Sequence, residues 1–222
     1  PTLRYLEIAP MQGLELAIFM QFFLGLVAAV NPIGIMPVFV SLTAHMPPEE
    51  RNRTAFQANI AVAVILIVSL VAGQLLLDMF SISLDSFRVA GGLLLLSIAF
   101  SMMSGKLGED KQNKQEKSEY ISKEQIGVVP LAMPLMAGPG AISSTIVYGS
   151  RYPAAIDTIG IGISIIAFAI CSWLLFRSAP VTVRFLAQPG INVITRIMGL
   201  ILGALGIEFI ANGLRNLFPG LA

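Results

Sequence analysis

The sequence predicts an all-α membrane protein of six transmembrane helices, arranged as two inverted three-helix repeats in which helices 1 and 4 are broken. Three observations lead to this prediction. The 222 residues are 55% hydrophobic and only 12% charged, whereas soluble domains are about 25% charged. The apolar residues gather in runs long enough to cross a bilayer. Two of these runs are interrupted by proline and glycine at corresponding places.

The apolar runs define six candidate spans. A helix needs about 20 apolar residues to cross a hydrocarbon core of about 30 Å. The first span is too long for one straight crossing, which fits two half-helices that meet at a break. The six spans cover residues 13–44, 55–77, 86–103, 126–149, 156–176 and 193–214.

Two spans contain a break within their apolar run. The first break is Asn31-Pro32-Ile33-Gly34 and the second is Gly138-Pro139-Gly140. Proline lacks an amide hydrogen and glycine adds backbone freedom, so both interrupt a helix. In hydrocarbon, such breaks persist only where they are buried in protein or line a wet cavity. A matched pair indicates a transporter substrate site, although proline kinks and small residues also serve helix packing.

A polar stretch divides the chain into two halves. Residues 105–125 carry five lysines among alternating acids, which predicts a solvated cytoplasmic linker between a first repeat at 1–104 and a second at 126–222. Arg88-x-x-Gly91 aligns with Arg196-x-x-Gly199 at an offset of 108, and Pro32 matches Pro139 at an offset of 107. Because each half crosses three times, the second half must be inverted relative to the first.

Lysine and arginine set the predicted orientation. Cytoplasmic loops of membrane proteins carry an excess of these residues. The basic residues outside the helix starts divide unequally between the two sides, so the richer side should be cytoplasmic and both termini should lie outside. The richer side holds Arg51, Arg53, Lys106, Lys111, Lys114, Lys117, Lys123, Arg177 and Arg184, and the other holds Arg4, Arg151 and Arg215.

The breaks predict a binding site for a small zwitterion. A half-helix end presents either unpaired N–H groups with a partial positive charge or unpaired carbonyls with a partial negative charge. Two breaks that meet near mid-membrane would offer both to one ligand. Polar side chains add hydrogen-bonding groups there, and the glycines keep the site narrow. The candidate substrate-binding residues are Asn31, Pro32, Gly34, Gly138, Pro139, Gly140, Ser143 and Ser144.

Ionisable residues inside the membrane are functional candidates. Arg88 and Arg196 begin their helices on opposite sides and are candidates for gating. Glu208 lies well inside the sixth span and is the candidate for proton or ion coupling. The alternatives are snorkelling to the interface, a pair of Arg88 with Asp85 or Asp78, and a pair of Glu208 with Arg215 or a backbone donor.

Several function classes are disfavoured. The net charge of +1 argues against nucleic-acid binding. Cys171 and His45 are each the only residue of their kind, so no metal site or nucleophile–base pair is expected. No phosphate-binding loop is present in the sequence. We therefore expect no enzyme activity, no cofactor, no metal and no catalytic residues.

Four segments resemble the MarC family of multi-pass membrane proteins. The resemblance runs from about residue 22 to residue 218. It implies six transmembrane helices in a bacterial or archaeal plasma membrane. In a bacterium this is the inner membrane. Members with an assigned activity look like transporters of small neutral amino acids such as glycine and alanine, and the family is similar to a grouping that includes lysine exporters. The segments are NPIGIMP at 31–37, FRVAGG at 87–92, PLMAGPGA at 134–141 and GINVITRIMG at 190–199.

Together these observations favour a secondary transporter of small neutral amino acids, working by alternating access. Two other classes stay open: a non-transporting membrane scaffold, and a lipid-interacting membrane protein. The scaffold predicts breaks that pack without a cavity, and the lipid-interacting protein predicts a lateral opening with a basic pocket.

Overall fold

A computed structural model of the chain describes residues 4–44, 46–104 and 136–218, with side chains from residue 16 onwards. All regular structure in these residues is helical, which agrees with the predicted class. The linker at 105–125 and the first part of the fourth predicted span, 126–135, lie outside the described residues. The helices are α1 (Arg4–Val30), α2 (Pro32–Leu42), α3 (Pro48–Met79), α4 (Leu84–Ser104), α6 (Pro139–Arg151), α7 (Ala155–Arg177) and α8 (Ala179–Leu217).

Within the described residues, four helices are long and apolar enough to cross a membrane: α3, α4, α7 and α8. Residues Leu16–Val30 of α1 and helix α2 form a fifth candidate, because the two pass the same test together with a bend of 42° between them. Of the fourth predicted span the structure describes α6, which by itself is about 20 Å long at 1.5 Å per residue. Six spans and an inverted repeat therefore stay predictions.

The outer surface of the bundle is apolar. On α3, large side chains exposed by about half or more recur every three or four residues: Phe56, Ile60, Val64, Val68, Val71 and Leu75. Helix α7 repeats this pattern from Ile156 to Leu174. In water an apolar face of this length would be a liability. In a bilayer it meets lipid tails, so this surface is typical of an integral membrane protein.

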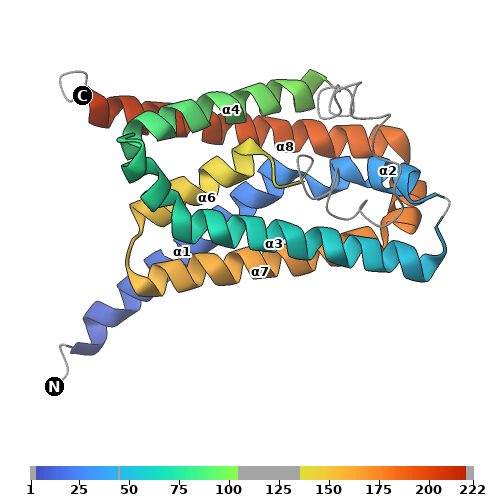
Figure 1. The fold of residues 1–222 in the computed structure, drawn as a ribbon, viewed down its shortest axis with the longest axis horizontal. Coiled ribbons are helices and arrows are strands. Elements are labelled where there is room, and N and C mark those ends of the chain that lie inside the picture. The colour runs from blue at the N-terminus through green and yellow to red at the C-terminus, as the bar shows by residue number, and fades with distance from the viewer. Residues whose placement is uncertain (1–3, 45, 105–135, 219–222) are drawn as a thin grey trace.

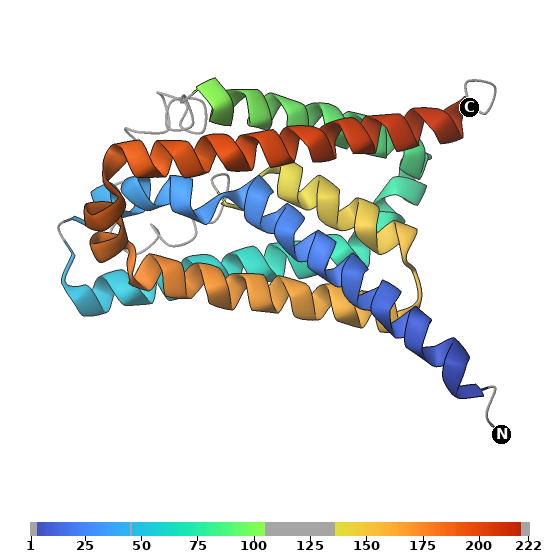
Figure 2. The ribbon, with the colours of Figure 1, turned by 180° about the vertical axis from the view of Figure 1, so that it is seen from behind.

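The helices form two walls with broken elements between them (Figures 1 and 2). Helices α4 and α8 run side by side as one wall, and α3 and α7 form the other. Helices α1, α2 and α6 lie between these walls, and the N- and C-termini lie at the same end of the bundle. That end also holds the end of α6, the start of α4 and the end of α8.

Helices α4 and α8 approach closely because glycines face each other. A Cβ on Gly92 would lie 2.6 Å from the carbonyl oxygen of Gly206, and a Cβ on Gly199 would lie 2.9 Å from Cβ of Met102. Small residues allow this approach, and van der Waals packing holds such helices together in lipid. The Arg-x-x-Gly segments that align between the two halves thus lie on helices that contact each other.

Helix boundaries differ from the prediction chiefly at α1, which begins at Arg4 rather than 13, and at α3 and α8. Helix α3 begins at Pro48 rather than 55, because proline suits the first helical position and Glu49 and Glu50 suit the first turn. Helix α8 begins at Ala179 rather than 193, with a kink at Ala187 (φ 49°, ψ 177°) two residues before Pro189. No helix was expected over residues 179–192, since this stretch is not apolar enough to read as a span.

Candidate functional site

The first predicted break is a helix boundary at a buried asparagine. Helix α1 ends at Val30 and α2 begins at Pro32, while Asn31 between them has left-handed backbone angles (φ 49°, ψ 66°). Asparagine tolerates this region better than most residues because its short polar side chain bonds locally. Here Oδ1 of Asn31 accepts a hydrogen bond from the backbone N–H of Gly34 at 3.3 Å. The side chain therefore caps the start of α2.

The same side chain links the break to α8. Nδ2 of Asn31 donates to Oγ1 of Thr195 at 3.3 Å, and Asn31 is 1% exposed and Thr195 6% exposed. The absence of a side chain at Gly34 makes this contact possible. A Cβ there would clash with Asn31 Nδ2 and lie 2.8 Å from Oγ1 of Thr195. Asn31, Gly34 and Thr195 thus form a buried polar cluster, which we call the break cluster.

The second predicted break precedes α6. Gly138 is extended (φ −75°, ψ 173°) and its carbonyl accepts from Ile142 at 3.1 Å. Pro139 takes the first helical position and is exposed, whereas Gly140 is buried against α4. A Cβ on Gly140 would lie 2.9 Å from Cδ1 of Ile98. The α6 N-terminus therefore packs tightly against α4, with its first backbone N–H groups at the break.

The two breaks border one core. Val30 and Ile35 flank the first break, and Ala137 and Ala141 flank the second, and all four belong to the same cluster of buried apolar side chains. The start of α6 and the junction of α1 and α2 lie near mid-length of the bundle (Figure 2). The first break thus joins the negative end of α1 to the positive end of α2, and the positive end of α6 borders the same core.

Ser143 and Ser144 are both buried on α6, at 2% and 7% exposure. Oγ of Ser143 has no hydrogen-bond partner among the described residues, and it lies where a Cβ on Gly91 of α4 would clash. A buried hydroxyl without a partner is costly in a low-dielectric interior. Ser143 is therefore the predicted site residue with hydrogen-bonding capacity left over.

A cavity of about 520 Å³ opens between α1, α4, α6 and α8, towards the end of the bundle that holds the termini. Its charged and polar lining is unusual beside the apolar outer surface, and we call it the charged cavity. Its volume lies in the range of small-molecule sites. The lining residues are Gln21, Leu24, Gly25, Arg88, Val147, Tyr148, Arg151, Tyr152, Ile201, Leu205, Glu208, Phe209 and Asn212.

The charges of this cavity have separate partners. The Arg88 guanidinium lies 3.3 Å from the Asp85 carboxylate, the only ion pair within the described residues, and Arg88 is 6% exposed. This pair is one of the alternatives that the sequence left open. Glu208 Oε1 accepts from Nδ2 of Asn212 at 2.7 Å rather than pairing with Arg215. Arg151 lies over the ring of Tyr152, 5.5 Å from its centroid.

The charged cavity lies along the two half-helices that end at the breaks. Gly25 of α1 lines it six residues before Asn31, and Val147 of α6 lines it eight residues after Pro139. At 1.5 Å per residue these separations are about 9 Å and 12 Å. Between the cavity and the break cluster, buried side chains of Ala28, Ala29 and Leu202 pack with Val147 and Phe209. This apolar layer lies between the charged cavity and the break cluster along α1 and α8.

Arg196 lies elsewhere. It is exposed on α8, one residue after Thr195, whereas Arg88 is buried in the first turns of α4. The structure thus brings Arg88 and Glu208 together at one cavity, groups Asn31 with Gly34 at one break, and places Arg196 at neither.

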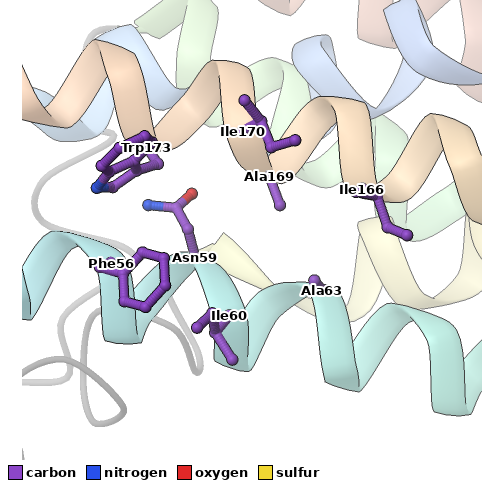
Figure 3. A pocket seen from close by; sticks show the side chains of 8 residues that line it. All are labelled: Phe56, Asn59, Ile60, Ala63, Ile166, Ala169, Ile170 and Trp173. Atoms are coloured by element: carbon purple, nitrogen blue, oxygen red, sulfur yellow. The ribbon is translucent and has the colours of Figure 1, made fainter.

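A second cavity, of about 160 Å³, lies between α3 and α7 (Figure 3). Asn59 extends from α3 towards α7 among apolar side chains that include Phe56, Ile170 and Trp173. Nδ2 of Asn59 donates to the carbonyl of Ala55 at 2.8 Å, and its Oδ1 is buried without a partner among the described residues. The wall of this cavity is otherwise apolar, which suits a lipid chain better than a polar solute.

Sequence reasoning missed Thr195 and most of the charged cavity. Ser144, Tyr148 and Arg151 are spaced by four and three residues, so they lie towards one face of α6, and Tyr152 follows directly after the helix. This spacing is the signal that connects the predicted break with the cavity. No local sequence pattern marked Thr195 as a partner of Asn31. No group of three or more potential metal ligands occurs in the described part of the chain.

The comparisons with known proteins agree with this architecture. Residues 16–218 match the family described as MarC family integral membrane protein. The chain is 59% identical over 207 residues to UPF0056 membrane protein YhcE of Escherichia coli (strain K12), which covers 93% of this chain and 96% of that protein. It is 35% identical over 202 residues to UPF0056 membrane protein PYRAB13050 of Pyrococcus abyssi (strain GE5 / Orsay), covering 90% and 96%.

A third relative is UPF0056 membrane protein MJ0972 of Methanocaldococcus jannaschii, 32% identical over 200 residues that cover 90% of this chain and 88% of that protein. No solved structure matches the chain significantly. The family match spans nearly the whole chain, and the structure has the long apolar helices of a multi-pass protein. The chain therefore belongs to the MarC family of integral membrane proteins.

Proposed function

We propose that the protein is a secondary transporter of small neutral amino acids, of the size of glycine or alanine, in the bacterial inner membrane. The observation that carries this proposal is the buried, left-handed Asn31 between α1 and α2, at a break that borders the same buried core as the start of α6. Buried helix breaks at membrane depth are typical of substrate sites in secondary transporters.

The chemistry of the breaks supports a zwitterionic substrate. The N-terminal N–H groups of α2 and α6 attract a carboxylate, and the C-terminal carbonyls of α1 attract an ammonium group. A hydroxyl group adds hydrogen-bonding capacity at each break: that of Thr195 beside Asn31, and that of Ser143 on α6, four residues after Pro139. Gly34 and Gly140 keep the backbone close to neighbouring side chains at both breaks, so a site there would favour a substrate with a small side chain.

The helix pairing supports an inverted repeat and alternating access. Helix α2, the second half of the first predicted span, contacts α8, and α6, the second half of the fourth, contacts α4. Each half of the chain thus places its broken helix against the last helix of the other half. A pseudo-two-fold axis in the membrane plane would produce this exchange, and rocking about it would open the breaks to either side. The driving force would be an ion gradient or the substrate gradient.

Uptake by purified protein in liposomes tests the proposal. Radiolabelled glycine and alanine should accumulate, leucine should compete weakly, and glycine should raise the thermal unfolding temperature of the detergent-solubilised protein. Asn31→Gly keeps the left-handed backbone accessible and removes the side chain, so it should fold and lose most of the stabilisation by glycine.

A non-transporting scaffold would give no uptake and no stabilisation by any amino acid. A lipid-interacting protein would respond to lipids and not to amino acids. Either pattern in wild-type protein that folds and reconstitutes normally would refute the transporter.

A further inference from the structure

The charged cavity holds fixed charges of both signs that do not neutralise each other. Among the described residues, Arg151 has no carboxylate within 4.0 Å, and Glu208 is hydrogen-bonded to Asn212 rather than to a cation. Arg88 of α4 and Arg151 of α6 both line the cavity, so their like charges border the same space. Apolar side chains of Leu24, Ile201 and Leu205 form part of the wall and reduce the screening of these charges.

We propose that the charged cavity is a second amino-acid site, separate from the breaks, that binds the substrate carboxylate between Arg88 and Arg151 and the substrate ammonium at Glu208. This proposal rests on the proposed function, because it takes the bound molecule to be the transported one. It gives Glu208 a role in binding in place of the coupling role expected from the sequence.

The electrostatics of the cavity favour a bound carboxylate. An anion between two guanidinium groups relieves their mutual repulsion and forms charge-assisted hydrogen bonds, which are stronger than neutral ones. Arg88 is 6% exposed and held by Asp85 on one side, so its orientation is fixed before a ligand arrives. Arg151 is exposed and held loosely over Tyr152, so it is free to close on the ligand.

The charged cavity and the break cluster would select for different properties of the same substrate. The charged cavity is large for glycine, so it selects for the presence of both charges rather than for a small side chain. The break cluster, where glycines contact their neighbours, selects for size. The apolar layer that contains Val147 and Phe209 separates the two sites and would have to move for a substrate to pass.

Binding of three probes tests this assignment: glycine, acetate and ethylamine. Acetate carries only the negative charge and ethylamine only the positive one. The variants are Arg151→Gln and Glu208→Gln, with Arg151→Lys as a conservative change. Arg215→Gln is the control, because Arg215 is an exposed arginine of α8 outside the cavity lining. Arg88 is not substituted, because its removal would also leave the Asp85 carboxylate without its ion-pair partner.

Arg151→Gln should weaken glycine and acetate binding by about tenfold or more and leave ethylamine binding unchanged. Glu208→Gln should weaken glycine and ethylamine and leave acetate unchanged. Arg151→Lys should recover most of the loss. In uptake, both variants should raise KM for glycine with little change in maximal rate, since the site precedes the breaks.

The outcomes separate the two proposals. If wild-type protein transports glycine and the Arg151 and Glu208 variants match the control for all three probes, the second site is wrong and the transporter stands. If the probes bind with the predicted charge dependence and no uptake occurs, the transporter is wrong and the site stands as a binding site only. If wild-type protein neither binds the probes nor transports, both are wrong.

Discussion

Asn31 donates a hydrogen bond from Nδ2 to Oγ1 of Thr195, 164 positions further along the chain. The same side chain accepts from the N–H of Gly34 and caps α2. One buried amide group therefore fixes the start of a half-helix and ties it to the last helix of the protein. This relationship makes the first break a defined structural element, and it leads to the first two predictions.

Asn31→Ala should destabilise the protein more than Asn31→Gly does. Both changes remove the side-chain cap, whose loss costs about 1 kcal/mol with alanine and only a few tenths with glycine. Alanine adds the cost of a left-handed backbone, about 1–2 kcal/mol, which glycine avoids. Thermal unfolding in detergent measures the difference. Equal melting temperatures for the two variants would mean that the backbone at residue 31 relaxes freely.

Gly34→Ala should abolish glycine uptake, because the new Cβ would displace Asn31 and Thr195 from each other. Gly162→Ala is the matched control, since a Cβ at that position would meet no neighbouring atom within 4 Å. That variant should transport like wild type and be slightly more stable, as alanine favours helix by up to about 1 kcal/mol. Normal transport by Gly34→Ala would contradict a tight break cluster.

Gly91→Ala should destabilise the contact between α4 and α6, because its Cβ would clash with Oγ of Ser143. Adding Ser143→Ala should recover part of the loss, since Cβ of Ser143 would still lie 3.3 Å from the new Cβ. Overpacking of this kind costs about 1–3 kcal/mol. A double-mutant cycle on unfolding temperature measures the coupling, and strictly additive effects would argue against the contact.

Asp85→Asn should destabilise the protein by about 1–3 kcal/mol, because it leaves the buried Arg88 guanidinium without its counter-charge. The carboxylate also accepts from Nδ2 of Asn216 at 3.0 Å, so the start of α4 would loosen from the end of α8. Asp78→Asn, at an exposed position near the end of α3, should change stability by less than about 0.5 kcal/mol. Similar effects of both variants would contradict the prediction.

Labelling of single cysteines tests the predicted orientation, in which both termini lie outside the cytoplasm. Cys171 is the only cysteine, so a Cys171→Ser background accepts single reporter cysteines. Helix directions place Arg53 and Arg215 at opposite ends of the bundle (Figure 1). In intact spheroplasts a membrane-impermeant maleimide should label Arg215→Cys and spare Arg53→Cys until the membrane is permeabilised. The reverse pattern would place the termini in the cytoplasm and invert the orientation.

Composition and apolar run length are enough to predict the protein class and the helical fold, and Pro32 with Gly34 locates the first break. Apolar content and run length depend only on which residues are present, and proline and glycine interrupt a helix wherever they occur. Asn31 and Gly138 were placed at helix starts for this reason, and the structure confirms both boundaries. The kink at Ala187 was not predicted, because the nearby Pro189 lies in a stretch that is too polar to be recognised as a transmembrane span.

Which of these residues contact each other depends on how the helices pack. Thr195 became the partner of Asn31 because α2 packs on α8, and no local pattern records a contact across 164 residues. Arg151 and Glu208 line the same cavity because α6 and α8 converge on α1, whereas Arg196, with an equally suggestive sequence context, faces outward. The direction of a side chain depends on how its helix is rotated and packed. The helical period of 3.6 residues shows only which residues share a face, not what that face contacts.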